Sequence, residues 1–165
     1  EVDKLATWAD DEPVGERDVV ALFAPVAEMP IYELPEAWAT RDTARALALS
    51  EATFERESRQ RRDTASRLAG ALGGHLGRLR SIKRLAVDGV RSKEAAERLK
   101  LNPYYAGKLF SQAEGFSPEE LHDSVVRLAE LDGSLKGQSR LAPDLEVQRA
   151  LVDLTRRPGA AARGS

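Results

Sequence analysis

The residue types that most often carry catalysis or hold metals are few in this sequence and widely spaced. The chain has no cysteine, which excludes a disulfide framework and any thiolate metal site. Its two histidines, His75 and His122, stand on separate predicted helices without a second ligand at helical spacing. We therefore interpret them as surface or interface residues and predict no metal site, no cofactor and no catalytic residue. An enzyme site assembled from distant residues stays open as an alternative.

A glycine run at residues 70–77 could be taken for a phosphate-binding loop. It reads Gly-Ala-Leu-Gly-Gly-His-Leu-Gly, without the Gly-Lys-Ser/Thr ending and without a strand before it. The four glycines recur instead at i, i+3, i+4 and i+7 within a predicted long helix, where each costs about 1 kcal/mol relative to alanine. We interpret this face as one that another helix approaches closely.

Residues 92–114 resemble a helix-turn-helix. A short helix after Ser92 is followed by Asn102-Pro103, which predicts an N-cap and a first-turn proline for the helix at 103–114. That helix carries Tyr104, Lys108 and Gln112 along one outer stripe, and in a DNA-binding protein it would enter the major groove. Two short helices with a tight turn also serve as plain core packing, so a DNA-binding regulator is the alternative hypothesis.

Five arginines gather between residues 56 and 67, interleaved with acids. Such spacing is typical of a solvated helix face with weak ion pairs. The formal net charge of the chain is -2, which argues mildly against tight nucleic-acid binding without excluding a local basic patch. Whether this arginine-rich stretch contacts DNA stays open.

Helical periodicity dominates the chain, and no segment alternates with period two over strand length. Ser117-Pro118-Glu119-Glu120 is a capping box with proline at the first helical position, and Pro143 opens the last helix. No stretch approaches 18 consecutive apolar residues, and no signal peptide leads the chain. We therefore predict an all-α fold of about eight helices, a cytoplasmic location and no membrane partner.

The order and spacing of several motifs resemble the delta subunits of bacterial DNA polymerase III, which are clamp-loader components. Ser92–Leu99 followed by Asn102-Pro103 is similar to the family stretch "S-x-E-x-A-x-x-L, hydrophobic, x-P, helix". Residues 128–137 resemble its "L-A-x-x-D-x-x-L-K-G", and residues 1–5 resemble its "E-x-x-K-L" helix. Residues 29–47 are similar to its helix pair after the lid.

The resemblance implies a division of the chain into three parts. Residues 1–27 would be the end of a small helical AAA+-type lid domain, and residues 28–157 a C-terminal helical collar that mediates oligomerisation. Residues 158–165 would be a disordered tail. Because the chain starts at Glu1 within an apolar helical repeat, we expect it to be a piece of a longer protein that lacks the AAA+-like N-terminal domain here.

The function implied is a subunit-assembly module of the clamp loader that supports sliding-clamp loading in DNA replication and is not an enzyme. Its expected partners are clamp-loader subunits of the gamma/tau and delta-prime types. The sliding clamp would be reached only through the missing N-terminal domain, and any DNA contact would be weak. The predicted subunit-interface residues are Gly73, Gly77, Tyr104, Lys108 and Gln112.

Overall fold

The computed structural model describes residues 29–156, and this part of the chain is entirely helical. It contains no strand, which confirms the predicted fold class. The proposed lid end at 1–27 and the tail at 158–165 lie outside the described residues, and the domain boundaries stay a prediction. The elements are α3 (Met29–Ala39), α4 (Thr43–Arg56), α5 (Arg61–Val87), α6 (Ser92–Leu99), α7 (Pro103–Glu114), α8 (Pro118–Gly133), the π-helical turn η2 (Ser134–Gln138) and α9 (Pro143–Thr155).

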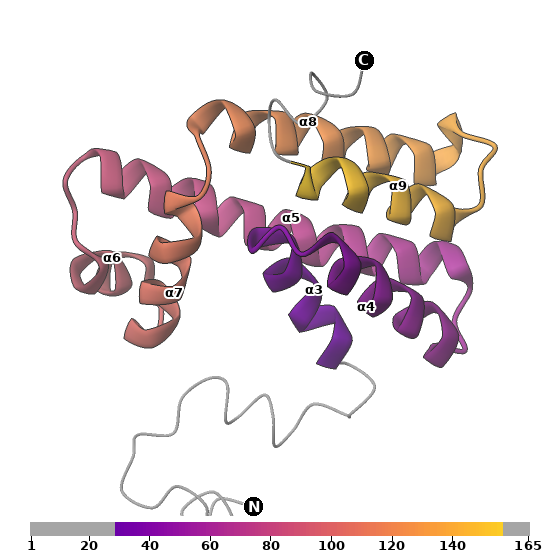
Figure 1. Cartoon of the computed structure of the whole chain (residues 1–165), viewed down its shortest axis with the longest axis horizontal. Coiled ribbons are helices and arrows are strands. Elements are labelled where there is room, and N and C mark those ends of the chain that lie inside the picture. Colours follow the sequence, from indigo (N-terminus) through magenta and orange to yellow (C-terminus); the bar gives the residue numbers. More distant parts are fainter. Residues whose placement is uncertain (1–28, 157–165) are drawn as a thin grey trace, which may run out of the picture.

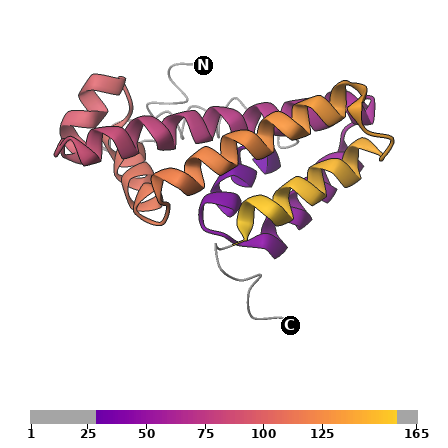
Figure 2. The same ribbon diagram turned by 90° about the horizontal axis from the view of Figure 1, so that it is seen from above.

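Helix α5 is the longest helix, and most of the other helices pack against it. Its 27 residues make it about 40 Å long. Helices α8 and α3 contact α5, α9 packs between α4 and α8 and also reaches α5, and α6 and α7 form a lobe at one end (Figures 1 and 2). The largest fully buried side chains come from most of these helices: Leu34, Trp38, Leu68, Leu72, Leu79, Ile82, Leu109, Leu131 and Leu151.

Helix α3 continues through a segment that contains two prolines. Pro30 is the second residue of the helix, where the backbone N–H needs no helical partner. Pro35 removes one helical hydrogen bond, but it is buried beside Leu34 and Trp38. The helix therefore continues through Pro35, where burial of the ring offsets the loss of one helical hydrogen bond.

Local start and stop signals place the later helices as predicted. The Asn102 side chain accepts hydrogen bonds from the backbone N–H groups of Tyr104 and Tyr105, and proline opens α7. The capping box at Ser117 is complete: Glu120 N donates to Ser117 Oγ, and Ser117 N donates to Glu120 Oε2 at 2.7 Å. Gly89, with φ of +79°, follows the end of α5.

Candidate subunit interface

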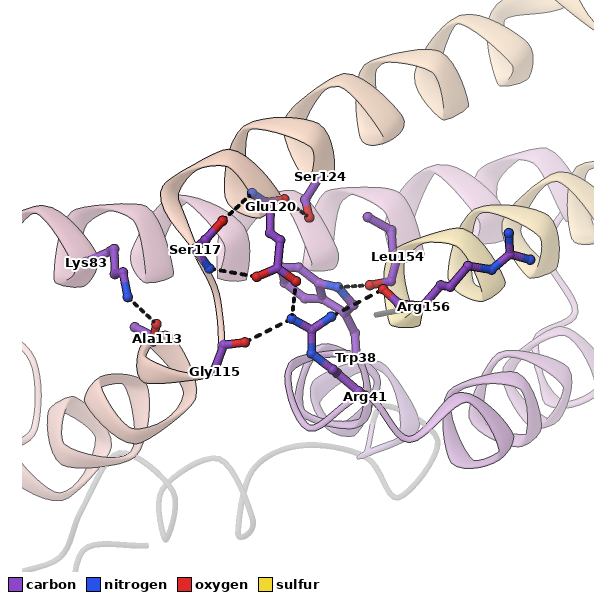
Figure 3. Close-up of polar contacts among 10 residues, drawn as sticks. All are labelled: Trp38, Arg41, Lys83, Ala113, Gly115, Ser117, Glu120, Ser124, Leu154 and Arg156. Atoms are coloured by element: carbon purple, nitrogen blue, oxygen red, sulfur yellow. Dashed lines mark hydrogen bonds and ion pairs between the residues drawn. The ribbon is translucent and has the colours of Figure 1, made fainter. Parts of the chain in front are cut away.

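Figure 3 shows a seam where α3, the α7–α8 turn and the end of α9 meet. Trp38 is fully buried there, and its indole Nε1 donates to the carbonyl oxygen of Leu154 at 3.1 Å. Its ring lies 5.9 Å from that of His75 and 5.6 Å from that of Phe116, between centroids. The Trp38 N–H thus satisfies a carbonyl in the last turn of α9 that has no partner within its own helix. We call Trp38, Arg41, His75, Phe116 and Glu120 the Trp38 seam.

Arg41, at the α3–α4 corner, contacts both the α7–α8 region and the end of α9 within this seam. Its Nη2 donates to Gly115 O at 2.9 Å and pairs with Glu120 Oε1, and its Nη1 donates to Arg156 O at 3.3 Å (Figure 3). The guanidinium also lies 4.4 Å from the centroid of the Phe116 ring. Its backbone has φ of +59°, an unfavourable region for a residue with a side chain. These contacts hold the α3–α4 corner against the end of α9.

His75 belongs to this buried seam, so its interpretation as a surface or interface residue was wrong. Its Nε2 is 2.9 Å from Oε1 of Gln112, which is also buried. Burial lowers the pKa of His75 to about 4, although its hydrogen bond to Gln112 opposes the shift and the nearby Arg78 adds to it. The imidazole is therefore neutral at pH 7 and serves packing. No cluster of three or more His, Asp or Glu that could hold a metal occurs within residues 29–156.

The predicted outer stripe on α7 does not stay on the surface. Tyr104 is 68% exposed, Lys108 is partly buried and forms an ion pair with Glu36 of α3, and Gln112 is 8% exposed. A step of four residues advances an α-helix about 40° beyond a full turn, so eight residues rotate the stripe from solvent into the core. The prediction that Gln112 lies on the outer surface is therefore wrong, and Tyr104 alone of the three is well exposed.

The glycines of α5 lie on a face that no other part of the described chain covers. Gly70, Gly73, Gly74 and Gly77 are exposed, and a Cβ atom built at any of them would meet nothing within 4 Å. The expected close approach of another helix is therefore absent within the described domain. We call these four residues the glycine face.

The arginine-rich stretch is split by the turn between α4 and α5. Arg67 pairs with Glu57 at 2.5 Å, and Arg61 pairs with Asp144 of α9 at 2.7 Å. Arg59 and Arg62 are exposed. The ion pairs of Arg61 and Arg67 thus stabilise the α4–α5 turn and its packing against α9. A DNA contact by this stretch stays a prediction.

Comparison with known proteins assigns this helical domain to a family. The family model described as "DNA polymerase III delta subunit, C-terminal domain" matches residues 28–154. The chain belongs to this family. The delta-family assignment covers most of the helical domain, including both the Trp38 seam and the glycine face, and it does not support the alternative of a helix-turn-helix regulator.

A solved structure shows the same delta-type fold. The DNA clamp loader delta protein of Bacillus subtilis superposes with a TM-score of 0.62 at 24% sequence identity. The alignment covers 94% of this chain and 44% of that protein, so the chain spans less than half of its length. No curated protein sequence matches the chain. Among the described helices, none is long and apolar enough to cross a membrane.

Sequence reasoning missed the seam and found the glycine face. The roles of Trp38 and Arg41 depend on carbonyl groups more than 70 residues away, which no local pattern encodes. The lone tryptophan among apolar residues of α3 was the only signal available. The glycine face was visible because its spacing follows the helical repeat.

Proposed function

We propose that this domain is the collar module of a clamp-loader delta subunit and acts by assembly with the other clamp-loader subunits. The proposal rests on the family match together with one structural observation, the open glycine face of α5. We assign it no reaction. The partners we propose are subunits of the gamma/tau and delta-prime types, and contact with the sliding clamp would need a domain outside this sequence.

The glycine face is the surface we propose for a neighbouring subunit, with Gly73 and Gly77 as contact positions. Helix axes usually lie about 8–10 Å apart, at a distance set by the side chains between them. Without side chains on one face, a partner helix can lie at the short end of that range. Within the described domain each glycine lowers helix stability by about 1 kcal/mol relative to alanine and gains no packing contact. A partner helix would supply the missing contact.

Tyr104 and Lys108 are the second proposed contact. Tyr104 presents an exposed aromatic ring at the start of α7, and tyrosine is enriched in protein interfaces. Lys108 already bridges to Glu36, so it would help to orient α7 for a partner rather than serve as an isolated charge. Gln112 is withdrawn from the contact surface because it bonds to His75 in the core.

The experiment is co-purification of the full chain with the gamma/tau- and delta-prime-type subunits of its own organism, followed by light scattering. The proposal predicts a defined hetero-oligomer at moderate salt. If the chain instead stays alone and shifts duplex DNA steeply with falling salt, the family match describes only the fold, and DNA binding through residues 103–114 takes its place.

A further inference from the structure

Positive charge is concentrated where α5 ends and α6 begins. Residues 78–100 contain eight Lys and Arg against three Asp and Glu, a formal charge of +5 in a chain whose total is -2. They cover the last turns of α5, the turn that follows it and α6, at the end of the bundle that projects as a lobe (Figure 1). We give the name basic surface to five exposed cations of this stretch: Arg80, Arg84, Arg91, Lys93 and Lys100.

The basic surface is not neutralised by the rest of the described domain. Within residues 29–156, the only ion pair formed by residues 78–100 joins Arg98 to Glu94. The other two acids of the stretch, Asp88 and Glu97, are exposed and form no ion pair in the described part of the chain. The charge of all five cations is therefore free to attract an anionic ligand.

Two of these cations do not serve the stability of their own helix. Arg91 and Lys93 flank the N-terminus of α6, whose first turn has no side-chain cap. A helix carries partial positive charge at this end, so basic side chains there are repelled by the backbone dipoles. An anion bound at this position would relieve that repulsion.

The surroundings of the basic surface suit nucleic acid better than a protein. Interfaces between proteins have an apolar core, whereas interfaces with nucleic acid are polar and strongly basic. Between residues 78 and 100, Val87 is the only large apolar side chain that is exposed. Every exposed residue of α6 is charged: Lys93, Glu94, Glu97 and Arg98. We therefore choose nucleic acid over an acidic protein segment as the ligand.

Helix α7, beside the basic surface, is not arranged to recognise a base sequence. Lys108 is paired with Glu36 of α3. Gln112 is bonded to His75 in the core, which leaves Tyr104 as the one well-exposed member of the predicted stripe. Sequence recognition needs several side chains of one element to reach base edges in a groove. A contact in this region is therefore one with phosphates.

We propose that the basic surface binds the phosphodiester backbone of nucleic acid, independently of base sequence. Its cations come from three adjoining stretches of chain, the end of α5, the turn after it and α6, so they can contact several phosphates at once. The contact adds to the proposed assembly role of the glycine face and does not depend on it.

The salt dependence of DNA binding by the full chain tests this contact. Each phosphate contact with duplex DNA changes the slope of log affinity against log salt by about -0.9, so five contacts predict a slope of about -4.5. Arg91→Gln with Lys93→Gln should bring the slope to about -2.7. Fluorescence anisotropy of a labelled duplex measures both, and a second duplex of unrelated sequence should bind equally well. A single strand of the same length should give a slope of about -3.5, because each contact then contributes about -0.7.

Two further variants serve as controls for charge and for folding. Arg62→Gln with Arg149→Gln removes the same charge from exposed cations outside the lobe and should leave the slope unchanged. Glu97→Gln removes an exposed acid four residues after Lys93 and should strengthen binding. Unchanged thermal unfolding by circular dichroism shows that each variant is folded.

The outcomes separate this proposal from the proposed function. Equal slopes for the parent and the Arg91 and Lys93 variant, equal losses in both double variants, or preference for one sequence overturn the phosphate contact. So does a loss of binding to partner subunits, with DNA binding intact, in the Arg91 and Lys93 variant, because the surface then serves a protein. A parent chain that shows the predicted slopes but assembles with no clamp-loader subunit supports the phosphate contact and contradicts the assembly role.

Discussion

The Trp38 seam and the glycine face are built on the same turns of α5 and differ in what covers them. His75 points into the seam, where Trp38 and Gln112 enclose it. Gly74, the residue before it, lies on the open side, with nothing within 4 Å of a Cβ position. One side of the helix is closed by hydrogen bonds and ring contacts that stabilise the domain. The other side has no covering element in the described chain, which is what we expect of a surface used for assembly.

The largest loss of stability should follow from removing the Trp38 side chain from the seam. Trp38→Ala removes a fully buried ring and its hydrogen bond to Leu154, and we expect it to lower the free energy of unfolding by about 3–5 kcal/mol. Trp38→Phe keeps most of the packing and should cost clearly less. Urea denaturation followed by circular dichroism measures both. A loss below about 1 kcal/mol for Trp38→Ala would show that the seam does not stabilise the domain.

Acid should weaken the seam through His75. The pKa of this residue is lowered from its ordinary value of 6.5 to about 4 in the folded chain. Between these values the unfolded chain binds a proton that the folded chain does not, so stability is full above about pH 6.5 and falls as the pH drops toward 4. The loss is on the order of 3 kcal/mol.

The variant His75→Leu isolates this contribution. Its free energy of unfolding should depend less on pH between about 4 and 6.5 than that of the parent chain. The matched variant His122→Leu, at an exposed histidine, should keep the parent's dependence. Equal pH dependence in the parent and in His75→Leu would contradict the buried, neutral histidine.

The side-chain contacts of Arg41 should stabilise the fold, whereas its positive φ should partly offset that stabilisation. Arg41→Ala removes the bonds to Glu120, Gly115 and Arg156, and we expect a loss of about 2–3 kcal/mol in thermal or urea unfolding. Arg41→Gly loses the same bonds but suits the positive φ, so it should be less harmful by about 1 kcal/mol. Arg45→Ala, which breaks an exposed pair with Glu33, should change stability by less than about 1 kcal/mol.

Substitution on the glycine face should raise the free energy of unfolding, in contrast to the substitutions in the Trp38 seam. Gly77→Ala adds a methyl group where there is open space, and it should raise the free energy of unfolding by up to about 1 kcal/mol. Gly137→Ala is a matched control: it also adds a methyl group in open space, but φ there is +109°, so it should destabilise. A destabilising Gly77→Ala in the isolated chain would mean that this face already has an intramolecular role.

The fold was predictable where the signals were local. Apolar spacing gave the all-α class, and the side chains of Asn102 and Ser117 marked the starts of α7 and α8. Helix α3 was not predictable in the same way, because it continues through a buried proline, Pro35, and packs against α4, α5 and α9. Local rules describe backbone preference, and tertiary packing can override them.

The candidate site was predictable only in part. The spacing of the glycines identified an unusual helix face, but it could not say whether a helix of the same chain or of a partner covers it. Tyr104 and Gln112 looked equivalent on a simple stripe, yet the rotation of the helix put one in solvent and the other against His75. The Trp38 seam had no sequence pattern, because it joins side chains to backbone carbonyls far along the chain.

The most direct test of the assembly surface is the affinity of Gly77→Leu for the gamma/tau- and delta-prime-type subunits, measured by analytical ultracentrifugation beside its stability. Ala48→Leu, at an exposed position of α4, adds the same side chain away from the glycine face. We predict that Gly77→Leu folds as stably as the parent chain and binds its partners at least about tenfold more weakly, a cost of about 1.4 kcal/mol, whereas Ala48→Leu binds normally. Undiminished assembly by a well-folded Gly77→Leu chain would contradict the glycine face as the subunit contact.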